Sequence, residues 1–67
     1  MGPRNIEYHD VEIEDDGVRY RASYYVKAGW IHLSSELGSK NAALNRAPAE
    51  GLARLLLHEL VQTKLGE

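Results

Sequence analysis

The segment VEIEDDGVRYRASYYVKAGWIHL, residues 11–33, alternates apolar and polar side chains, which is typical of half-buried β-strands. Asp16-Gly17 lies within it, and this dipeptide favours a type I′ turn, in which both central residues need a positive φ. A hairpin with this turn sets apolar residues opposite each other and carboxylates opposite arginines. The predicted pairs are Ile13 with Tyr20, Val11 with Ala22, Glu14 with Arg19 and Glu12 with Arg21. A slip of one residue would break every pair, so the register is well specified.

A second turn is predicted at Ala28-Gly29. It gives the pairs Val26 with Ile31, Tyr24 with Leu33, Lys27 with Trp30 and Tyr25 with His32. The first two pairs share the inner face with Ile13 and Tyr20, and the last two lie on the opposite, outer face. The sequence therefore predicts a three-stranded antiparallel meander with strands over about 8–14, 18–27 and 30–34. A change of phase before residue 10 indicates either a bulge near residues 9–10 or a strand that starts late.

The rest of the chain is predicted to form a loop over residues 35–47 and a helix over about 48–65. We expect Leu37 and Leu44 of the loop to pack against the core. Pro48 suits the first turn of a helix, where its missing N–H costs nothing. One apolar stripe of the helix should cover the inner face of the sheet: Ala49, Leu52, Ala53, Leu56 and Leu60. Residues 1–67 are therefore expected to form a single α+β domain, β-β-β-α, in two layers.

Length and composition limit the classes of function. A chain of 67 residues buries only about 60% of the surface that its unfolded form exposes, so its core is marginal. The absence of cysteine excludes disulfides, thiolate zinc sites and a cysteine nucleophile. A net charge of −2 argues against a dedicated nucleic-acid binder, which would usually be basic. No apolar run approaches the roughly 18 residues of a membrane span, and the N-terminal segment lacks the apolar core of a signal peptide, so we expect a cytoplasmic location.

His58-Glu59 on the predicted helix matches the first half of the zinc-peptidase motif H-E-x-x-H. Gln62 stands where the motif needs its second histidine, so a metal ion would lack a ligand. The loop serines have no evident histidine and carboxylate oriented to activate them. The sequence therefore predicts no metal, no cofactor and no enzyme, and a hydrolase built on the loop serines is only a third class of function.

The outer face of the predicted sheet combines cations with aromatic rings: Arg19, Arg21, Tyr25, Lys27, Trp30 and His32, with Tyr8 as a further candidate. Such a set can hold phosphates and stack on bases, and exposed large aromatic residues often mark protein contacts. Glu12 and Glu14 lie across from the two arginines and should neutralise much of their field. A solvated face held by cross-strand ion pairs is the alternative.

The predicted helix carries a second apolar row, Leu57, Val61 and Leu65, beside the core stripe. One helix on a three-stranded sheet does not easily cover both rows. The second row is therefore a candidate dimer contact, most simply in a two-fold dimer. A wider core stripe is the alternative interpretation.

Residues 29–62, GWIHLSSELGSKNAALNRAPAEGLARLLLHELVQ, contain a strand end of the form I-x-[VL]-S-S, a Gly-Ser-Lys loop and a helix of the form LARxLLxEL. This half of the chain resembles a group of small bacterial proteins with no assigned function. The resemblance implies a strand, a loop and a helix, and it brings no activity with it. It draws attention to Ser34, Ser35, Gly38, Ser39 and Lys40.

The sequence thus predicts a small non-catalytic binding module that contacts a protein partner or forms a homodimer. The expected contact residues are Trp30, Tyr25, Arg19, Arg21, Lys27, His32 and Lys40. The alternative is nucleic-acid binding through the same outer face, with Lys40 and Arg46 of the loop adding positive charge.

Overall fold

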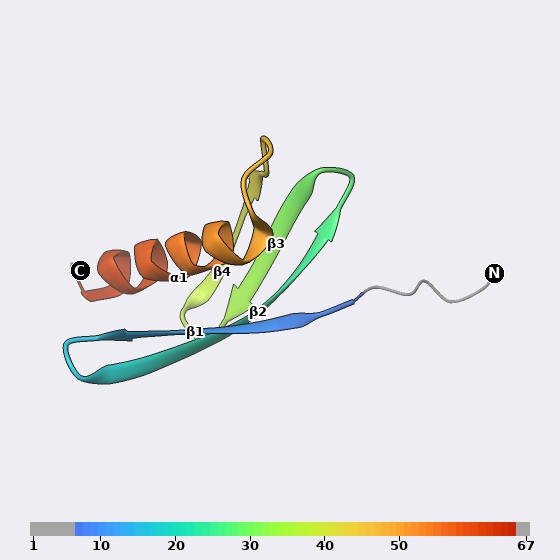
Figure 1. Cartoon of the computed structure of the whole chain (residues 1–67). Coiled ribbons are helices and arrows are strands. Elements are labelled where there is room, and N and C mark those ends of the chain that lie inside the picture. Colours follow the sequence, from blue (N-terminus) through green and yellow to red (C-terminus); the bar gives the residue numbers. More distant parts are fainter. Residues whose placement is uncertain (1–6, 66–67) are drawn as a thin grey trace.

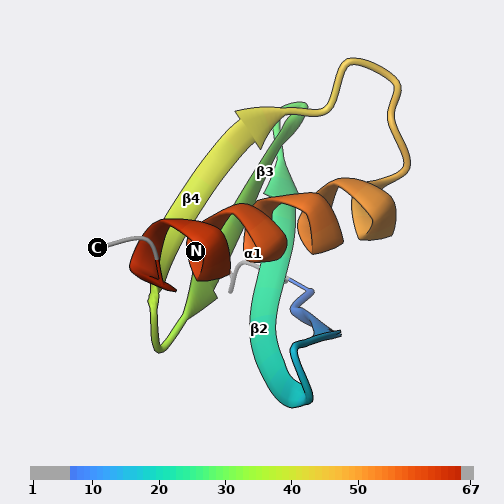
Figure 2. The same cartoon turned by 90° about the vertical axis from the view of Figure 1, so that its left-hand side faces the viewer.

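A computed structural model describes residues 7–65. The elements are β1 (His9–Asp15), β2 (Val18–Lys27), β3 (Trp30–Ser35), β4 (Gly38–Ala43) and α1 (Ala49–Leu65). The strands form one antiparallel sheet in the order β1-β2-β3-β4, and α1 crosses one face of it (Figure 1, Figure 2). The α+β class and the two-layer packing are confirmed. The predicted number of strands was wrong, because the sheet has four strands.

The register of the first three strands is the one predicted from the two Gly-containing turns. Each of the predicted cross-strand pairs in β1–β2 and β2–β3 is present. The turn residues have the positive φ angles that a type I′ turn requires, 56° and 80° at Asp16 and Gly17, and 54° and 80° at Ala28 and Gly29. The β1–β2 ladder is continuous from His9 to Asp15, so a late start and not a bulge explains the change of phase.

The fourth strand lies within the segment that was predicted to be a loop. β4 has the sequence GSKNAA, which contains no β-branched or aromatic residue and no clear apolar alternation. It pairs with β3 along its whole length, from Gly38 opposite Ser35 to Ala43 opposite Trp30. The predicted Gly-Ser-Lys loop is therefore the start of a strand. The turn before it is held by Ser35, whose Oγ accepts a hydrogen bond from the N–H of Leu37 at 3.1 Å and donates one to the Gly38 carbonyl at 3.1 Å.

The core lies between α1 and the inner face of the sheet. Its fully or nearly buried members are Val11, Ala22, Tyr24, Ile31, Leu33, Ala53, Leu56, Leu57, Leu60 and Val61. Leu37 and Leu44 pack against this cluster as expected. The middle of β2 is buried, whereas its end residues Val18 and Val26 are about half exposed.

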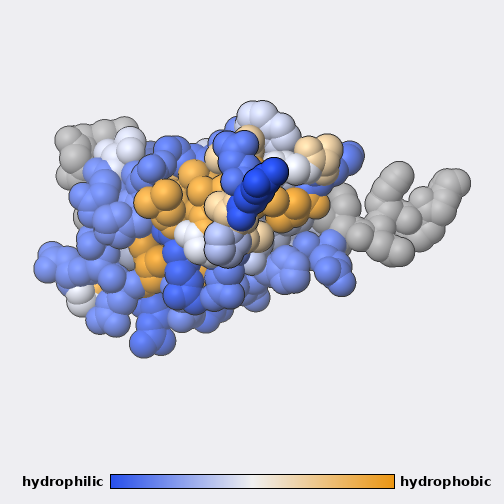
Figure 3. Space-filling view, turned by 45° about the horizontal axis from the view of Figure 1, so that its top comes forward, coloured by the Kyte–Doolittle hydropathy of each residue, from blue (hydrophilic) through white to orange (hydrophobic). Residues whose placement is uncertain are grey.

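The helix row that was a candidate dimer contact belongs to the core, as in the alternative interpretation. Leu57 and Val61 are 0% exposed, so the buried stripe of α1 is wider than the predicted one. The side chain of Leu65 lies outside the described residues. Leu55 is the flanking leucine that stays 52% exposed. Hydrophobic residues still reach the surface in a patch bordered by hydrophilic ones (Figure 3).

Within residues 7–65, α1 is too short and too polar to cross a membrane.

Candidate functional site: the outer face of the sheet

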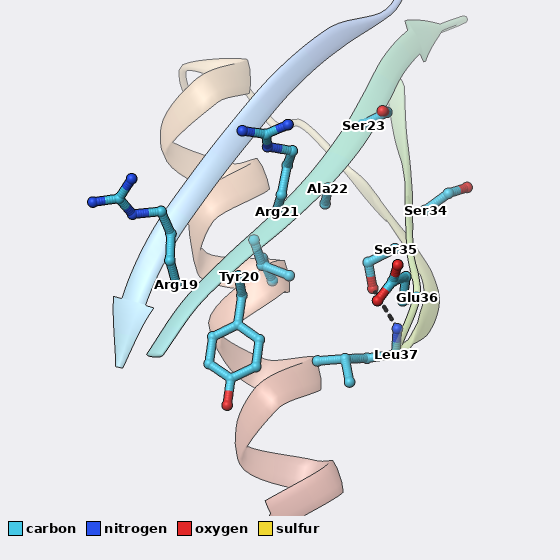
Figure 4. Close-up of a pocket in the computed structure, with 10 residues that line it drawn as sticks. Arg19, Tyr20, Arg21, Ala22, Ser23, Ser34, Ser35, Glu36 and Leu37 are labelled. Carbon is cyan, nitrogen blue, oxygen red and sulfur yellow. Dashed lines mark hydrogen bonds between the residues drawn. The ribbon is translucent and has the colours of Figure 1, made fainter. Parts of the chain in front are cut away.

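The outer face, meaning the side of the sheet opposite α1, has no helix over it within the described residues. Because side chains alternate along a strand, the residues that do not point at α1 gather there. They are Asp10, Glu12 and Glu14 on β1, Arg19, Arg21, Ser23, Tyr25 and Lys27 on β2, Trp30, His32 and Ser34 on β3, and Ser39, Asn41 and Ala43 on β4. Figure 4 shows this alternation at β2, where Arg19 and Arg21 lie on one side and Tyr20 on the other.

Aromatic rings form a row across β2 and β3. Tyr25 and His32 are direct cross-strand partners, and their rings stack with centroids 4.8 Å apart and an interplanar angle of 16°. Tyr8, just before β1, contacts the other side of the row, with its ring centroid 5.4 Å from that of Tyr25 in an edge arrangement. Trp30 lies two residues before His32 on β3 and is 48% exposed, and Tyr8 is 65% exposed. Tyr8 and Trp30 therefore present large rings to water, whereas Tyr25 and His32 are half-buried.

A shallow hollow of about 320 Å³ lies beside this row, towards β4. Its lining residues are Tyr25, His32, Leu33, Ser34, Ser39, Lys40 and Asn41. The hydroxyl groups and the carboxamide among them can both donate and accept hydrogen bonds. The hollow thus offers neutral polar groups next to a stacked ring pair.

The charges of the outer face are segregated by strand, with carboxylates on β1 and arginines on β2. Arg21 donates two hydrogen bonds to Glu12 Oε2, from Nη2 at 2.8 Å and from Nε at 3.2 Å. This hydrogen bonding lowers the pKa of Glu12 below its ordinary value and raises the pKa of Arg21. Both groups therefore stay charged at neutral pH and neutralise each other. Arg19 and Lys27 make no ion pair with another residue of the described part of the chain.

Lys40, a predicted contact residue, is among the residues that line the shallow hollow, but its side chain lies on the helix side of the sheet. It stands opposite Leu33 on β4, which directs its side chain to the helix layer. There its Nζ lies 2.8 Å from Glu59 Oε1 of α1. The sequence assigned Lys40 to a loop, so the side of the sheet that its side chain takes was not predicted.

A second hollow, of about 610 Å³, lies where β2 extends beyond the end of β3. Arg19 and Arg21 line it together with Tyr20, Ala22, Ser23, Ser34, Ser35, Glu36, Leu37 and Leu57 (Figure 4). The sequence did not predict this hollow, because it depends on the unequal lengths of two paired strands. The hydroxyl of Ser35 is already engaged in the β3–β4 turn, so it is not poised as a nucleophile.

The His58-Glu59 pair is divided between two surface contacts. His58 Nε2 lies 3.8 Å from Asp15 Oδ1, and Glu59 binds Lys40. Among residues 7–65, no group of three or more histidine and carboxylate side chains converges to hold a metal ion.

The Glu12–Arg21 pair predicts a pH effect that can be measured. Replacing Arg21 by Gln should raise the pKa of Glu12 towards its ordinary value, because the guanidinium hydrogen bond is the main cause of the lowered pKa. Replacing Arg19 by Gln should raise it less, since Arg19 acts on Glu12 only through its charge. An NMR titration that follows the Glu12 carboxyl carbon measures both changes.

The same pair makes a contribution to stability that depends on pH. Because the pKa of Glu12 is lowered in the folded state, this contribution is present above the ordinary carboxyl pKa and is lost as the pH falls through the lowered value. Equal titration of Glu12 in the wild type and in Arg21→Gln would show that the pair does not persist in solution.

The outer face brings together six predicted contact residues, Arg19, Arg21, Tyr25, Lys27, Trp30 and His32, and adds neutral polar groups from β4. The resemblance of residues 29–62 to small bacterial proteins stays a prediction. Comparisons with protein families, with curated proteins and with solved structures found no match to this chain.

Proposed function

We propose that this chain is a small non-catalytic interaction module that contacts another protein through the outer face of its sheet. The observation that carries this proposal is the row of aromatic rings, with Tyr8 and Trp30 exposed, on a face that no described helix covers. Tryptophan and tyrosine bury a large apolar area when a partner covers them, and they are enriched among the residues that dominate protein interfaces. A cytoplasmic location belongs to the same proposal and rests on sequence composition alone.

The charge pattern favours a protein over a nucleic acid as the partner. Phosphates approaching the outer face would meet the carboxylates of Asp10, Glu12 and Glu14 on β1. Arg21 is already bound to Glu12, and Lys40 is turned to the helix layer. A nucleic acid would therefore gain few unneutralised cations, although phosphate contacts usually supply much of the affinity for such a ligand.

Nucleic-acid binding is the second candidate, and the stacked rings of Tyr25 and His32 favour it. The two rings lie nearly parallel with centroids 4.8 Å apart, so a base could extend the stack on the side of His32 that faces away from Tyr25. Binding of this kind should weaken steeply as salt rises, because counterions are released. A contact centred on Trp30 with a protein should depend much less on salt.

A photo-crosslinking experiment separates the two candidates. A benzophenone amino acid replaces Trp30 on the outer face, or Gln62 on the solvent side of α1 as the matched control, and the cells of the native host are irradiated. We expect an adduct from position 30 that protease removes and nuclease does not, and little or no adduct from position 62. An adduct that nuclease removes would instead establish the nucleic-acid candidate. Equal adducts from the two positions, or none from position 30, would contradict binding through the outer face.

A further inference from the structure

The two edges of the sheet differ in how they are protected. β1 carries four carboxylates, Asp10, Glu12, Glu14 and Asp15. β4 carries one charged residue, Lys40, among small neutral ones, and it contains no proline. It is the last strand in the sheet order, so no described strand pairs with its outer side. Natural proteins usually protect such an edge with charges, proline or a covering element, because its free backbone groups pair readily with another strand.

The register of β3 and β4 determines which backbone groups are free. The N–H of Leu44 donates to the carbonyl of Gly29 at 2.9 Å, one step beyond the pair Trp30–Ala43. In an antiparallel ladder, the backbone N–H and C=O groups of successive residues point alternately towards the partner strand and away from it. The N–H and C=O groups of Ser39, Asn41 and Ala43 therefore point outward from the edge of the sheet.

We propose that β4 pairs antiparallel with β4 of a second copy of this chain, about a two-fold axis at Asn41. In this register Asn41 stands opposite Asn41 of the second copy, and Ser39 stands opposite Ala43. Every outward N–H and C=O of these three residues then has a partner, as an extended edge requires. The two sheets become one continuous sheet in a symmetric dimer, and the β4 edge of each copy is covered.

The charge of Lys40 favours this register and allows a second copy of the chain to approach the edge. Lys40 faces Ala42 of the second copy, and its ammonium group is already neutralised by Glu59 at 2.8 Å. A register centred on Lys40 would instead set two ammonium groups against each other, which is unfavourable for residues directly opposite. On the outer face, the two Asn41 carboxamides meet at the axis, where each can donate to and accept from the other.

The proposed dimer goes beyond the outer-face contact and does not depend on it. It uses the backbone edge of β4, whereas the outer-face contact uses the rings of β2 and β3. It also replaces the dimer contact predicted from Leu57 and Val61, which are buried in their own chain. On the outer face, dimerisation would place the Tyr25–His32 stacks of the two copies on either side of the Asn41 pair.

Sedimentation equilibrium with Asn41→Pro tests the proposal. The N–H of Asn41 points outward, so proline removes no bond within the monomer, and proline is tolerated on edge strands with this orientation. We expect a mass of about twice 7.5 kDa for the wild type. Asn41→Pro should weaken the dimer at least about tenfold, a change of about 1.4 kcal/mol. The matched variant Asn41→Thr keeps the N–H and should stay dimeric.

Amide exchange gives a second readout that does not rely on a variant. The amides of Ser39, Asn41 and Ala43 should become protected as the wild-type concentration rises. The outward amides of β1, at Asp10, Glu12 and Glu14, should exchange quickly at every concentration. A monomeric wild type at millimolar concentration, or fast exchange at all six amides, would overturn the proposal. Asn41→Pro does not alter position 30, so crosslinking from position 30 in this variant shows separately whether the outer-face contact survives.

Discussion

Replacing Leu57 by Ala is expected to lower the free energy of unfolding by about 2–5 kcal/mol, because its side chain is completely buried and truncation leaves a cavity. The total stability of a domain of 67 residues is about 3–10 kcal/mol. Leu57→Ala should therefore lose a large part of the stability of the domain. Urea unfolding followed by far-UV circular dichroism measures the loss at a fixed protein concentration.

Leu55→Ala is the matched control, because it removes the same atoms two residues away on α1. About half of the Leu55 side chain is exposed, so its loss should cost less than about 0.5 kcal/mol. The difference between the two variants should be the same at every protein concentration, since Leu57 makes its contacts within one chain. Equal losses of unfolding free energy in the two variants would contradict the burial of Leu57. A difference that grows with protein concentration would indicate that Leu57 contacts another copy of the chain.

The sequence predicted the parts of the fold that depend on local pattern. Asp16-Gly17 and Ala28-Gly29 locate their turns, and a one-residue slip would break the pairing on both faces, so the register of three strands follows. β4 was not predicted, because its residues are small or polar. Its strand conformation comes from the free edge of β3, which is tertiary context.

The predicted core stripe of the helix was too narrow, and the missing strand affected the site. Leu57 and Val61 are buried beside Ala53, Leu56 and Leu60, which is the ordinary width of a buried helix face. Lys40 was assigned to the contact surface because a loop residue has no defined side. Tyr25, Trp30 and His32 were placed correctly, because alternation alone determines the face of a residue in a strand of known register.

A large loss of stability is also expected when Gly38, the first residue of β4, is replaced by alanine. Its φ of +143° lies in a region that only glycine adopts readily. A Cβ at this position would lie 3.7 Å from Leu60 Cδ2, which is an ordinary contact, so the backbone conformation and not the space opposes a side chain. Gly38→Ala is therefore expected to lower the free energy of unfolding by about 1–3 kcal/mol.

Gly51→Ala is the matched control, with the opposite expected sign. Gly51 lies in the first turn of α1, is exposed, and would have no atom within 4 Å of its new Cβ. Alanine should raise the free energy of unfolding by up to about 0.5–1 kcal/mol, because glycine loses more backbone entropy in a helix. The urea midpoints of the two variants, at an unchanged slope, measure both effects.

The sign of the stability change in Gly38→Ala also tests β4, the strand that the sequence did not predict. If Gly38→Ala is destabilising while Gly51→Ala is stabilising, the backbone at residue 38 is held in the conformation that starts β4. The edge with Ser39, Asn41 and Ala43 then exists in solution as the structure places it. If Gly38→Ala is neutral, residue 38 is free to relax, and the β3–β4 hairpin does not constrain it. The proposed pairing of two β4 strands would then lack the rigid edge that it needs.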